Sequence, residues 1–453
     1  MYTLFQDSNF NQKLWRLMLP ITLQNLMLSA VAAGDAVMLG RLAQNAMTGV
    51  SLATQVQFVQ NMALSSIVAG GTVLGAQYWG IRDTRRISEI FFMCLRWAGL
   101  VSLGFFIACE FFPGEVMKIF TNDPELARIG AGYLRIAGWS YLLSGVSQCY
   151  QMLMKVTDHV GRVAAISSGA VIMNIGFNAV LIFGLFGAPA LGANGAALAT
   201  LLARIIELVW SVASTFQKGF LKPDFRLALK RDRLLSKDYR KVTVPLLGAG
   251  MFWSVGFTSY TAIIGHLGAD AAAANSVSSV VRELMCCVCN GISAAGGIIV
   301  GNELGAGNLE KGKTYGIRLA RISVLIGLAT TAAVLLVTWP VSRFMILSDQ
   351  ARSYFIGMMV IMSFYMIGRV VNTVVINGIF DSGGDTAFDV YSLAVAMWGL
   401  AIPTALLGAF VFHWPVLLVY SCTCLDEVGK LPWVFIHFKK YKWVQNLTRQ
   451  ETQ

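Results

Sequence analysis

PITLQNLMLSAVAAGDAVMLGRL (residues 20–42) and PLLGAGMFWSVGFTSYTAIIGHL (residues 245–267) align without a gap when the chain is shifted by 225 positions. The same register continues beyond these two stretches, as far as residue 305. Proline and glycine set the geometry of the backbone, so their coincidence indicates that the chain is built from two similar halves. The coinciding pairs include Pro20 with Pro245, Ser29 with Ser254, Gly71 with Gly296, and Gly80 with Gly305.

The composition of the chain is too apolar for a soluble protein. Of the 453 residues, 56% are hydrophobic and 13% are charged, and the mean hydropathy is +0.62. Soluble domains are roughly 45–50% apolar and about 25% charged. Each apolar run is long enough to cross a bilayer, which takes about 20 helical residues. The runs lie near 12–36, 46–76, 87–110, 126–154, 163–187, 191–216, 241–264, 271–300, 314–338, 352–378, 386–410 and 414–438.

The polar segment 217–240 divides these runs into two equal sets. We predict an all-α integral membrane protein of twelve transmembrane helices in two pseudo-symmetric six-helix bundles. Its lobes span 1–216 and, with a short cytoplasmic tail, 241–453. Parallel repeats of this kind form a substrate cavity between the halves near the middle of the membrane. The linker 217–240 is basic and amphipathic, which predicts a helix on the inner membrane surface.

Lysine and arginine gather in one set of connections, which includes both ends of the chain and the linker. Cytoplasmic loops collect positive charge, so we expect both termini on the cytoplasmic side of the inner membrane. This bias accounts for the formal net charge of +11 and argues against binding of nucleic acid. The eight cysteines lie in or beside apolar runs without CxxC pairs, and we expect neither a metal site nor disulfides.

Motifs along the whole chain resemble the multidrug and toxic compound extrusion family, MATE. The first helix, with its proline followed fifteen residues later by Asp35, is similar to the first helix of that family. The other motifs are AQYWGIRD at 76–83, NIGFNAVLIFG at 174–184 followed by PALGANGAALAT at 189–200, GISAAGGIIVGNELGAGNLEKGKTYG at 291–316, INGIFDSGGDTAF at 376–388 and KWVQNLT at 442–448. The chain thus resembles a NorM/DinF-like efflux transporter of the wider MOP flippase superfamily.

The resemblance implies a V-shaped antiporter that exports organic, often cationic, compounds in exchange for H⁺ or Na⁺ by alternating access. It implies no cofactor and no nucleotide, and a single chain already contains both halves of a cavity. The Na⁺-coupled branch carries a glutamate where this chain has Trp253. It also uses an acid on its tenth helix, which this chain lacks, offering Arg369, Asn372 and Asn377 instead. That departure moves the expected coupling site to the first half.

Two other functions fit parts of this pattern. A flippase for lipids or lipid-linked oligosaccharides shares the architecture, although its motifs match less well. A membrane-embedded enzyme would need clustered histidines or a nucleophile beside a base, and the four histidines are scattered at loops and helix ends. We therefore expect a transporter and not an enzyme.

Asp35 is the first candidate for cation coupling, because a carboxylate in an apolar run is costly and usually functional. Its repeat partner is Tyr260, so the fold does not require an acid there. The alternative is an aspartate solvated at the helix end. Asn174 and Asn178 are one turn apart on one helix face, and amide oxygens can hold a protonated carboxyl or Na⁺. The resemblance places them beside Asp35 and adds Thr200, whereas ordinary interhelical hydrogen bonding is the alternative.

Pro20 and Pro245 each remove a backbone hydrogen bond, so we expect a kink in both helices, either static or linked to Asp35 protonation. Aromatic and methionine side chains near the expected cavity suit flat organic cations, although ordinary packing is the alternative. Adjacent Arg282 and Glu283 point in different directions and cannot satisfy each other well, so we expect them to contact the cavity or a neighbouring helix. Arg204 can pair with Glu207, and Asp426 or Glu427 with Lys430. The candidate cavity residues are Phe58, Met62, Trp253, Phe257, Tyr260, Arg282, Glu283, Tyr365 and Arg369.

Overall fold

The computed structural model of the chain describes residues 8–40, 44–120, 123–187, 189–228, 232–345 and 347–449. Within these ranges, the side chains of residues 8, 30–37, 39, 40, 44, 45, 47 and 269 are not described. The described residues form helices and connections only, with no β-strand among them. Nine of the helical segments that could be assessed are long and apolar enough to cross a membrane. The fold is therefore that of an all-α membrane protein.

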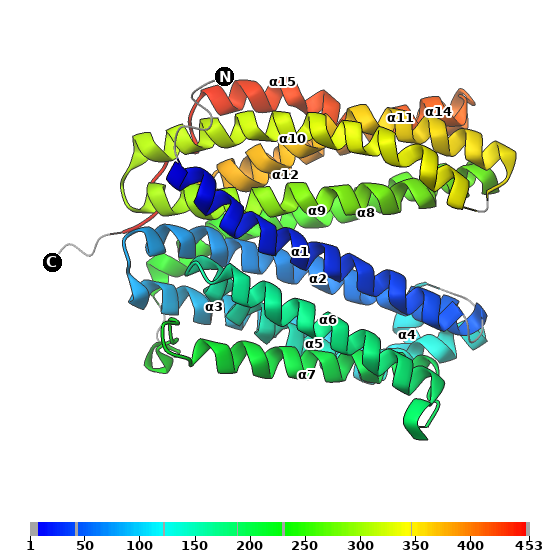
Figure 1. Cartoon of the computed structure of the whole chain (residues 1–453), viewed down its shortest axis with the longest axis horizontal. Helices are drawn as coiled ribbons and strands as arrows, with labels where there is room; N and C mark the ends of the chain where they lie inside the picture. Colours follow the sequence, from blue (N-terminus) through cyan, green and yellow to red (C-terminus); the bar gives the residue numbers. More distant parts are fainter. Residues whose placement is uncertain are drawn as a thin grey trace. The chain divides into compact units, whose positions relative to one another are not determined.

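The helices follow the predicted spans in order (Figure 1). The first half contains α1 (Ser8–Gly40), α2 (Gln44–Gly80), α3 (Thr84–Phe111), the short α4 (Pro113–Lys118), α5 (Pro124–Val156), α6 (Val160–Phe183), η1 (Leu185–Gly187) and α7 (Ala193–Thr215). The second half contains α8 (Arg233–His266), α9 (Ala269–Gly305), α10 (Leu309–Phe344), α11 (Asp349–Asn372) with η3 (Thr373–Phe380) and η4 (Asp381–Gly383), α12 (Ala387–Leu393) with η5 (Ala394–Ala401), α13 (Ile402–Leu406) and η6 (Leu407–Val411), and α14 (Val416–Thr423) with α15 (Leu425–Lys439).

Three expected spans are not among the nine: they correspond to α1, to α5, and to α14 together with α15. With them the described part of the chain provides all twelve predicted helical spans. The eleventh span is the least regular, because η5 and η6 are π-helical turns inserted between α12, α13 and the following loop. The tenth span likewise passes into the π-helical segment η3 after Asn372.

The chain forms two compact units. Unit 1 comprises the residues up to Thr22, Ala76–Ile81 and the residues from Arg240 onward, and unit 2 comprises Leu23–Gly75 and Arg82–Tyr239. In unit 1, α10 packs against α11 and both contact α9. In unit 2, α5 packs against both α3 and α7, and α6 packs against α7. The lobes predicted at 1–216 and 241–453 remain a prediction.

Two glycines of the internal repeat make reciprocal contacts inside unit 1. A Cβ atom at Gly80, at the end of α2, would lie 2.0 Å from the carbonyl oxygen of Asn302 on α9. A Cβ atom at Gly305, at the end of α9, would lie 1.9 Å from the carbonyl oxygen of Gln77 on α2. Since 77 and 302 are also 225 positions apart, the same close packing occurs twice in the repeat register. Only glycine allows the backbones to approach this closely.

The C-terminal tail is fastened to the same place by the side chain of Gln77. Its Nε2 donates to the carbonyl oxygens of Ser382 at 2.7 Å and Gln445 at 3.3 Å, and its Oε1 accepts from the backbone N–H of Leu447 at 2.6 Å. The Trp443 side chain is fully buried in this arrangement. We call Gln77, Ser382 and residues 443–447 the tail clamp. It joins the motifs that begin at 76, 376 and 442, all within unit 1.

The linker differs from the prediction. Residues 217–224 are turns and irregular chain, followed by the single 3₁₀ turn η2 (Phe225–Leu227), and α8 already begins at Arg233. Gly219 has a φ of +91° and Pro223 follows it closely, so a continuous surface helix does not form. The Asp232 carboxylate instead caps α8, accepting from the N–H groups of Leu234 at 2.8 Å and Leu235 at 3.1 Å. The Arg86 guanidinium holds the pKa of Asp232 below its usual range.

Both repeat prolines lie inside long helices. Pro20 lies in α1 and Pro245 in α8, and each helix continues on both sides of its proline. A proline inside a helix leaves the carbonyl of the residue four positions earlier without its helical donor. That missing bond is the physical basis of the predicted kinks, and whether the helices bend in transport stays a prediction.

Candidate functional site

A polar relay crosses from α6 to α7 in unit 2. The Asn178 amide Nδ2 donates to Oδ1 of Asn174 at 3.1 Å, and Nδ2 of Asn174 donates to the Thr200 hydroxyl at 3.3 Å. All three side chains are buried, with Asn178 fully so. The structure therefore brings together three residues that the sequence analysis assigned to one coupling site. Their part in cation coupling stays a prediction.

Asp35, the predicted centre of the coupling site, lies on α1. Its side chain falls outside the described residues, so no contact of its carboxylate is stated. Its backbone belongs to unit 2, the unit that also contains α6 and α7.

A second polar network in unit 2 was not predicted from the sequence. Nε2 of Gln24 donates to the Ser167 hydroxyl at 2.9 Å, and Nε2 of Gln151 donates to the Glu207 carboxylate at 2.9 Å. Glu207 also forms the predicted ion pair with Arg204, at 2.5 Å. Glutamines give no charge signal in a sequence, which is why only the charged pair could be found there.

Unit 1 holds a buried ion cluster around Glu427 on α15. The Glu427 carboxylate is 2.8 Å from Nη1 of Arg369 on α11 and 3.0 Å from Nζ of Lys430. It also accepts from the Asn372 amide at 2.8 Å. Glu427 is 1% exposed, so one buried anion is shared by two cations and an amide. The predicted pair with Lys430 is confirmed, while the interhelical partner Arg369 was expected only to line the cavity.

Further buried carboxylates of unit 1 are those of Asp381, Asp389 and Asp426. Asp426, beside Glu427, is 3% exposed, and its Oδ1 makes no hydrogen bond within the described residues. Asp389 on α12 is 8% exposed and accepts from the Asn377 amide at 3.4 Å. Asn377 lies in the π-helical segment η3, whose wider turn displaces side chains from the ordinary helical spacing. Asp389 was missed because it lies only six residues from the turn at Gly383, where a sequence suggests a solvated connection.

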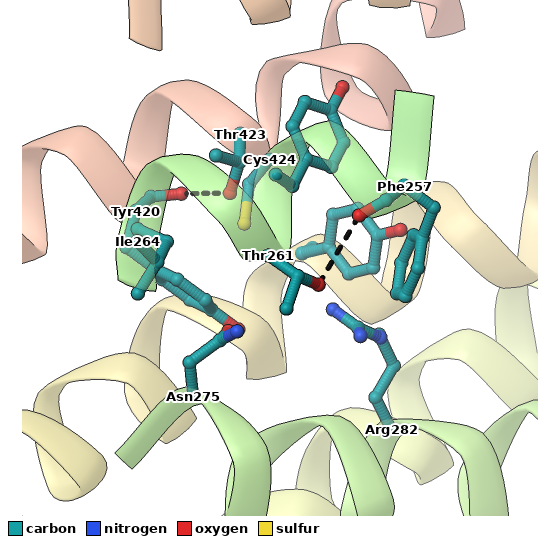
Figure 2. A pocket seen from close by; sticks show the side chains of 10 residues that line it. Phe257, Thr261, Ile264, Asn275, Arg282, Tyr420, Thr423 and Cys424 are labelled. Carbon is teal, nitrogen blue, oxygen red and sulfur yellow. Dashed lines mark hydrogen bonds between the residues drawn. The ribbon is translucent and has the colours of Figure 1, made fainter. Parts of the chain in front are cut away.

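A small cavity opens beside this cluster, between α8, α9, α11 and α14 (Figure 2). Its volume is about 20 Å³, which is room for about one water. Figure 2 shows the Arg282 guanidinium pointing into the cavity below Thr261 and Phe257, with Asn275 on the same side. The lining residues are Phe257, Tyr260, Thr261, Ile264, Asn275, Arg282, Tyr365, Tyr420, Thr423 and Cys424.

Four predicted cavity residues line this cavity: Phe257, Tyr260, Arg282 and Tyr365. Two more, Trp253 and Arg369, lie next to these lining residues. The Trp253 ring stacks on Phe257 with ring centroids 5.2 Å apart, and the Arg369 guanidinium lies 5.6 Å from the centre of the Trp253 ring.

The remaining three predicted cavity residues lie elsewhere. Glu283 is exposed and is not among the lining residues, so it diverges from Arg282 as expected for neighbours on a helix. Phe58 is 38% exposed and Met62 is half-buried, and both belong to α2 in unit 2. Their role in a substrate cavity stays a prediction.

The match to a known protein family falls on both halves of the internal repeat. A family model named MatE matches residues 20–180 and 245–407, two blocks that begin at the paired prolines and cover most of the chain. The chain belongs to the MatE family. No group of histidine, cysteine and acidic residues among those described could hold a metal ion.

Relatives match this MatE protein over most of their length. The probable multidrug resistance protein NorM of Mesorhizobium japonicum is 27% identical, over 87% of this chain and 86% of the relative. The uncharacterized transporter YisQ of Bacillus subtilis is 21% identical, over 97% of this chain and 96% of the relative. In structure, a MOP superfamily transporter from Pyrococcus furiosus matches with a TM-score of 0.86 and 15% identity, over 96% of each chain. The fold is therefore the MATE fold.

Membership in this family settles the class of protein. MatE proteins are multi-pass membrane transporters, so this chain is a transporter and not an enzyme, and it needs no cofactor.

Proposed function

We propose that this chain exports small organic compounds, often cationic, from the cytoplasm in exchange for inward-moving H⁺ or Na⁺. Relatives named as multidrug resistance proteins, NorM and MdtK, support drug-like substrates. Export against a gradient needs an energy source, and the sequence carries no phosphate-binding loop of the GxxxxGK[ST] type. An inward cation gradient is the remaining source that these residues suit.

The polar relay Asn178–Asn174–Thr200 is the observation that carries the proposal. Three buried polar side chains joined by hydrogen bonds at 3.1 and 3.3 Å are costly in membrane-spanning helices unless they serve a purpose. Their donors and acceptors run in one direction, from the Asn178 amide to the Thr200 hydroxyl. Such a chain of amides can present oxygen to Na⁺ or to a protonated carboxyl.

Asp35 supplies the charge in this proposal. A carboxylate in a low-dielectric setting gains stability when it is protonated or binds Na⁺, and it loses that ion when the site faces the side of lower cation concentration. The cycle between the two forms changes the local charge by one unit. A change of this kind can shift the balance between inward-open and outward-open states, with bending at Pro20 and Pro245 as a route.

We also propose where the chain lies in the cell and how its parts are arranged. The Lys and Arg bias supports an inner-membrane location with both termini in the cytoplasm. We further propose lobes over 1–216 and 241–453, contact with membrane lipids, and function as a monomer, because one chain contains both halves of the repeat.

The proposal is tested by efflux of ethidium from proteoliposomes under an imposed pH gradient or an imposed Na⁺ gradient. Wild type is compared with Asp35→Asn and with Asp349→Asn, a control at a fully exposed surface carboxylate. We expect one gradient to drive efflux in wild type and in the control but not in Asp35→Asn. Equal gradient-driven efflux in Asp35→Asn would place the coupling elsewhere, and no efflux in wild type under either gradient would reject the proposed function.

A further inference from the structure

Arg282 brings a positive charge into the cavity of unit 1 from the membrane-spanning helix α9. Its guanidinium carbon lies 4.3 Å from the centre of the Phe257 ring, and one Nη donates to the Ser279 hydroxyl at 3.0 Å. A guanidinium has five N–H donors in one plane, so most of them remain for another partner. The ring and the hydroxyl fix the orientation of the side chain without neutralising its charge.

Arg282 lacks a carboxylate partner among the described residues. The nearby Arg369 pairs with Glu427 at 2.8 Å, whereas no ion pair within the described residues includes Arg282. Its sequence neighbour Glu283 is exposed and does not line the cavity. An arginine at membrane depth is costly, and such charges are usually paired or functional. The missing counter-charge therefore points to a ligand.

The cavity also holds neutral groups that can donate to an anion. The Tyr260 hydroxyl is a lining group and its residue is 8% exposed; it makes no hydrogen bond of ordinary geometry within the described residues, and the buried Asp426 carboxylate lies close to it. The Asn275 side chain, which is 7% exposed, lines the same cavity and makes no hydrogen bond with the described residues. Each can donate while Arg282 supplies the charge. Tyrosine, amide and guanidinium donors around one small space form a receptor for a carboxylate.

We propose that this cavity binds the anionic group of a transported compound, a carboxylate or sulfonate, with Arg282 as its counter-ion. The proposal rests on the proposed export function and adds to its substrates compounds that carry an acidic group, alone or beside a basic group. The cavity of about 20 Å³ has room for about one water, so it receives one anionic oxygen of the head group, and the rest of the compound lies outside it. Aromatic side chains next to it, Phe257 and Trp253, provide a stacking surface for that body.

Binding is measured by calorimetric titration of the purified, detergent-solubilised chain, which does not depend on transport. The ligands are sodium 2-naphthoate and 2-naphthamide, which share an aromatic body and differ in charge. The variants are Arg282→Gln, Tyr260→Phe and the control Arg343→Gln, in which an exposed arginine stacked 5.1 Å from Trp339 is replaced. Sodium chloride titrated in a chloride-free buffer tests whether a free inorganic anion occupies the site instead.

We expect wild type and Arg343→Gln to bind naphthoate at least tenfold more tightly than naphthamide. That ratio corresponds to the free energy of one hydrogen bond to a charged group. Arg282→Gln should weaken naphthoate binding by about 10- to 100-fold, and Tyr260→Phe by roughly three- to tenfold. If Arg282→Gln does not yield monodisperse protein, the Tyr260→Phe result and the naphthoate-to-naphthamide ratio of wild type decide.

Equal binding of the two ligands by wild type, or naphthoate binding unchanged in both cavity variants, would overturn the proposal. Chloride binding that depends on Arg282 and excludes naphthoate would also overturn it, because the site would then serve an inorganic ion. Failure of the export function has a separate sign: ethidium efflux by wild type would be absent while naphthoate binding still depended on Arg282.

Discussion

Thr200 on α7 is the end of the polar relay and accepts from the Asn174 amide at 3.3 Å. Thr200→Val removes that acceptor and keeps the shape of the side chain. We expect the gradient-driven rate of ethidium efflux to fall several-fold, because Asn174 is then free to turn away from Asn178. The control Thr215→Val lies on the same helix and is fully buried, but its hydroxyl bonds only to the Ser211 carbonyl one turn earlier. A rate lowered equally in both variants would contradict a role for the relay.

Among the described residues, Glu427 is the anion that pairs with both Arg369 and Lys430, at 2.8 and 3.0 Å. Glu427→Gln leaves two cations in a buried setting, and removing one partner of a buried pair costs about 3–5 kcal/mol. We expect a clear fall in the unfolding temperature of the detergent-solubilised protein. Glu310→Gln, at an exposed residue with a loose pair to Lys313, is the control and should change little. An unfolding temperature unchanged in Glu427→Gln would show that the cluster is not structural.

These residues also show which side-chain contacts can be predicted from the sequence. Asn174 and Asn178 could be placed on one face because they are one turn apart, and the contact between them confirms it. Arg369 and Glu427 are 58 positions apart on different helices, and nothing in local spacing connects them. The sequence therefore suggested only the partner three residues away, Lys430.

Among the elements, the tail clamp makes the sharpest prediction. Gln77→Ala removes the side chain that bonds Ser382, Gln445 and Leu447. We expect faster hydrogen exchange of the backbone amides between residues 443 and 449, because the tail then opens without global unfolding. Gln60→Ala is the control: Gln60 is equally buried and makes a bond to the Tyr141 carbonyl at 3.0 Å, away from the tail. Exchange raised in both variants, or in neither, would contradict the clamp.

The tail clamp and the linker show two different limits of sequence patterns. Motifs at 76–83, 376–388 and 442–448 were each identified, but only tertiary packing brings them together around Gln77. The linker was predicted as a surface helix from its charge pattern, and Gly219 and Pro223 prevail over that pattern through backbone geometry. Helical spans are predictable because a bilayer leaves few alternatives, whereas connections depend on local chain geometry.

For the whole molecule, the charge bias predicts which loops face the cytoplasm. Single cysteines are introduced as Lys118→Cys, near the end of α4, and Lys218→Cys, in the linker, after Cys286 and Cys424, which are only half-buried, have been changed to serine. We expect a membrane-impermeant maleimide to label Lys118→Cys in intact cells and Lys218→Cys only after permeabilisation. The opposite pattern would invert the orientation and the direction of export with it.

Cation antiport is the central claim, and it is tested most directly by running the exchange in reverse. Proteoliposomes with a trapped pH-sensitive or Na⁺-sensitive dye receive an ethidium gradient and no ion gradient. The account predicts that ethidium moving down its gradient drives H⁺ or Na⁺ the opposite way in wild type, and that Asp35→Asn does not couple the two. Ethidium movement through wild type with no movement of either ion would contradict antiport and leave a facilitator in its place.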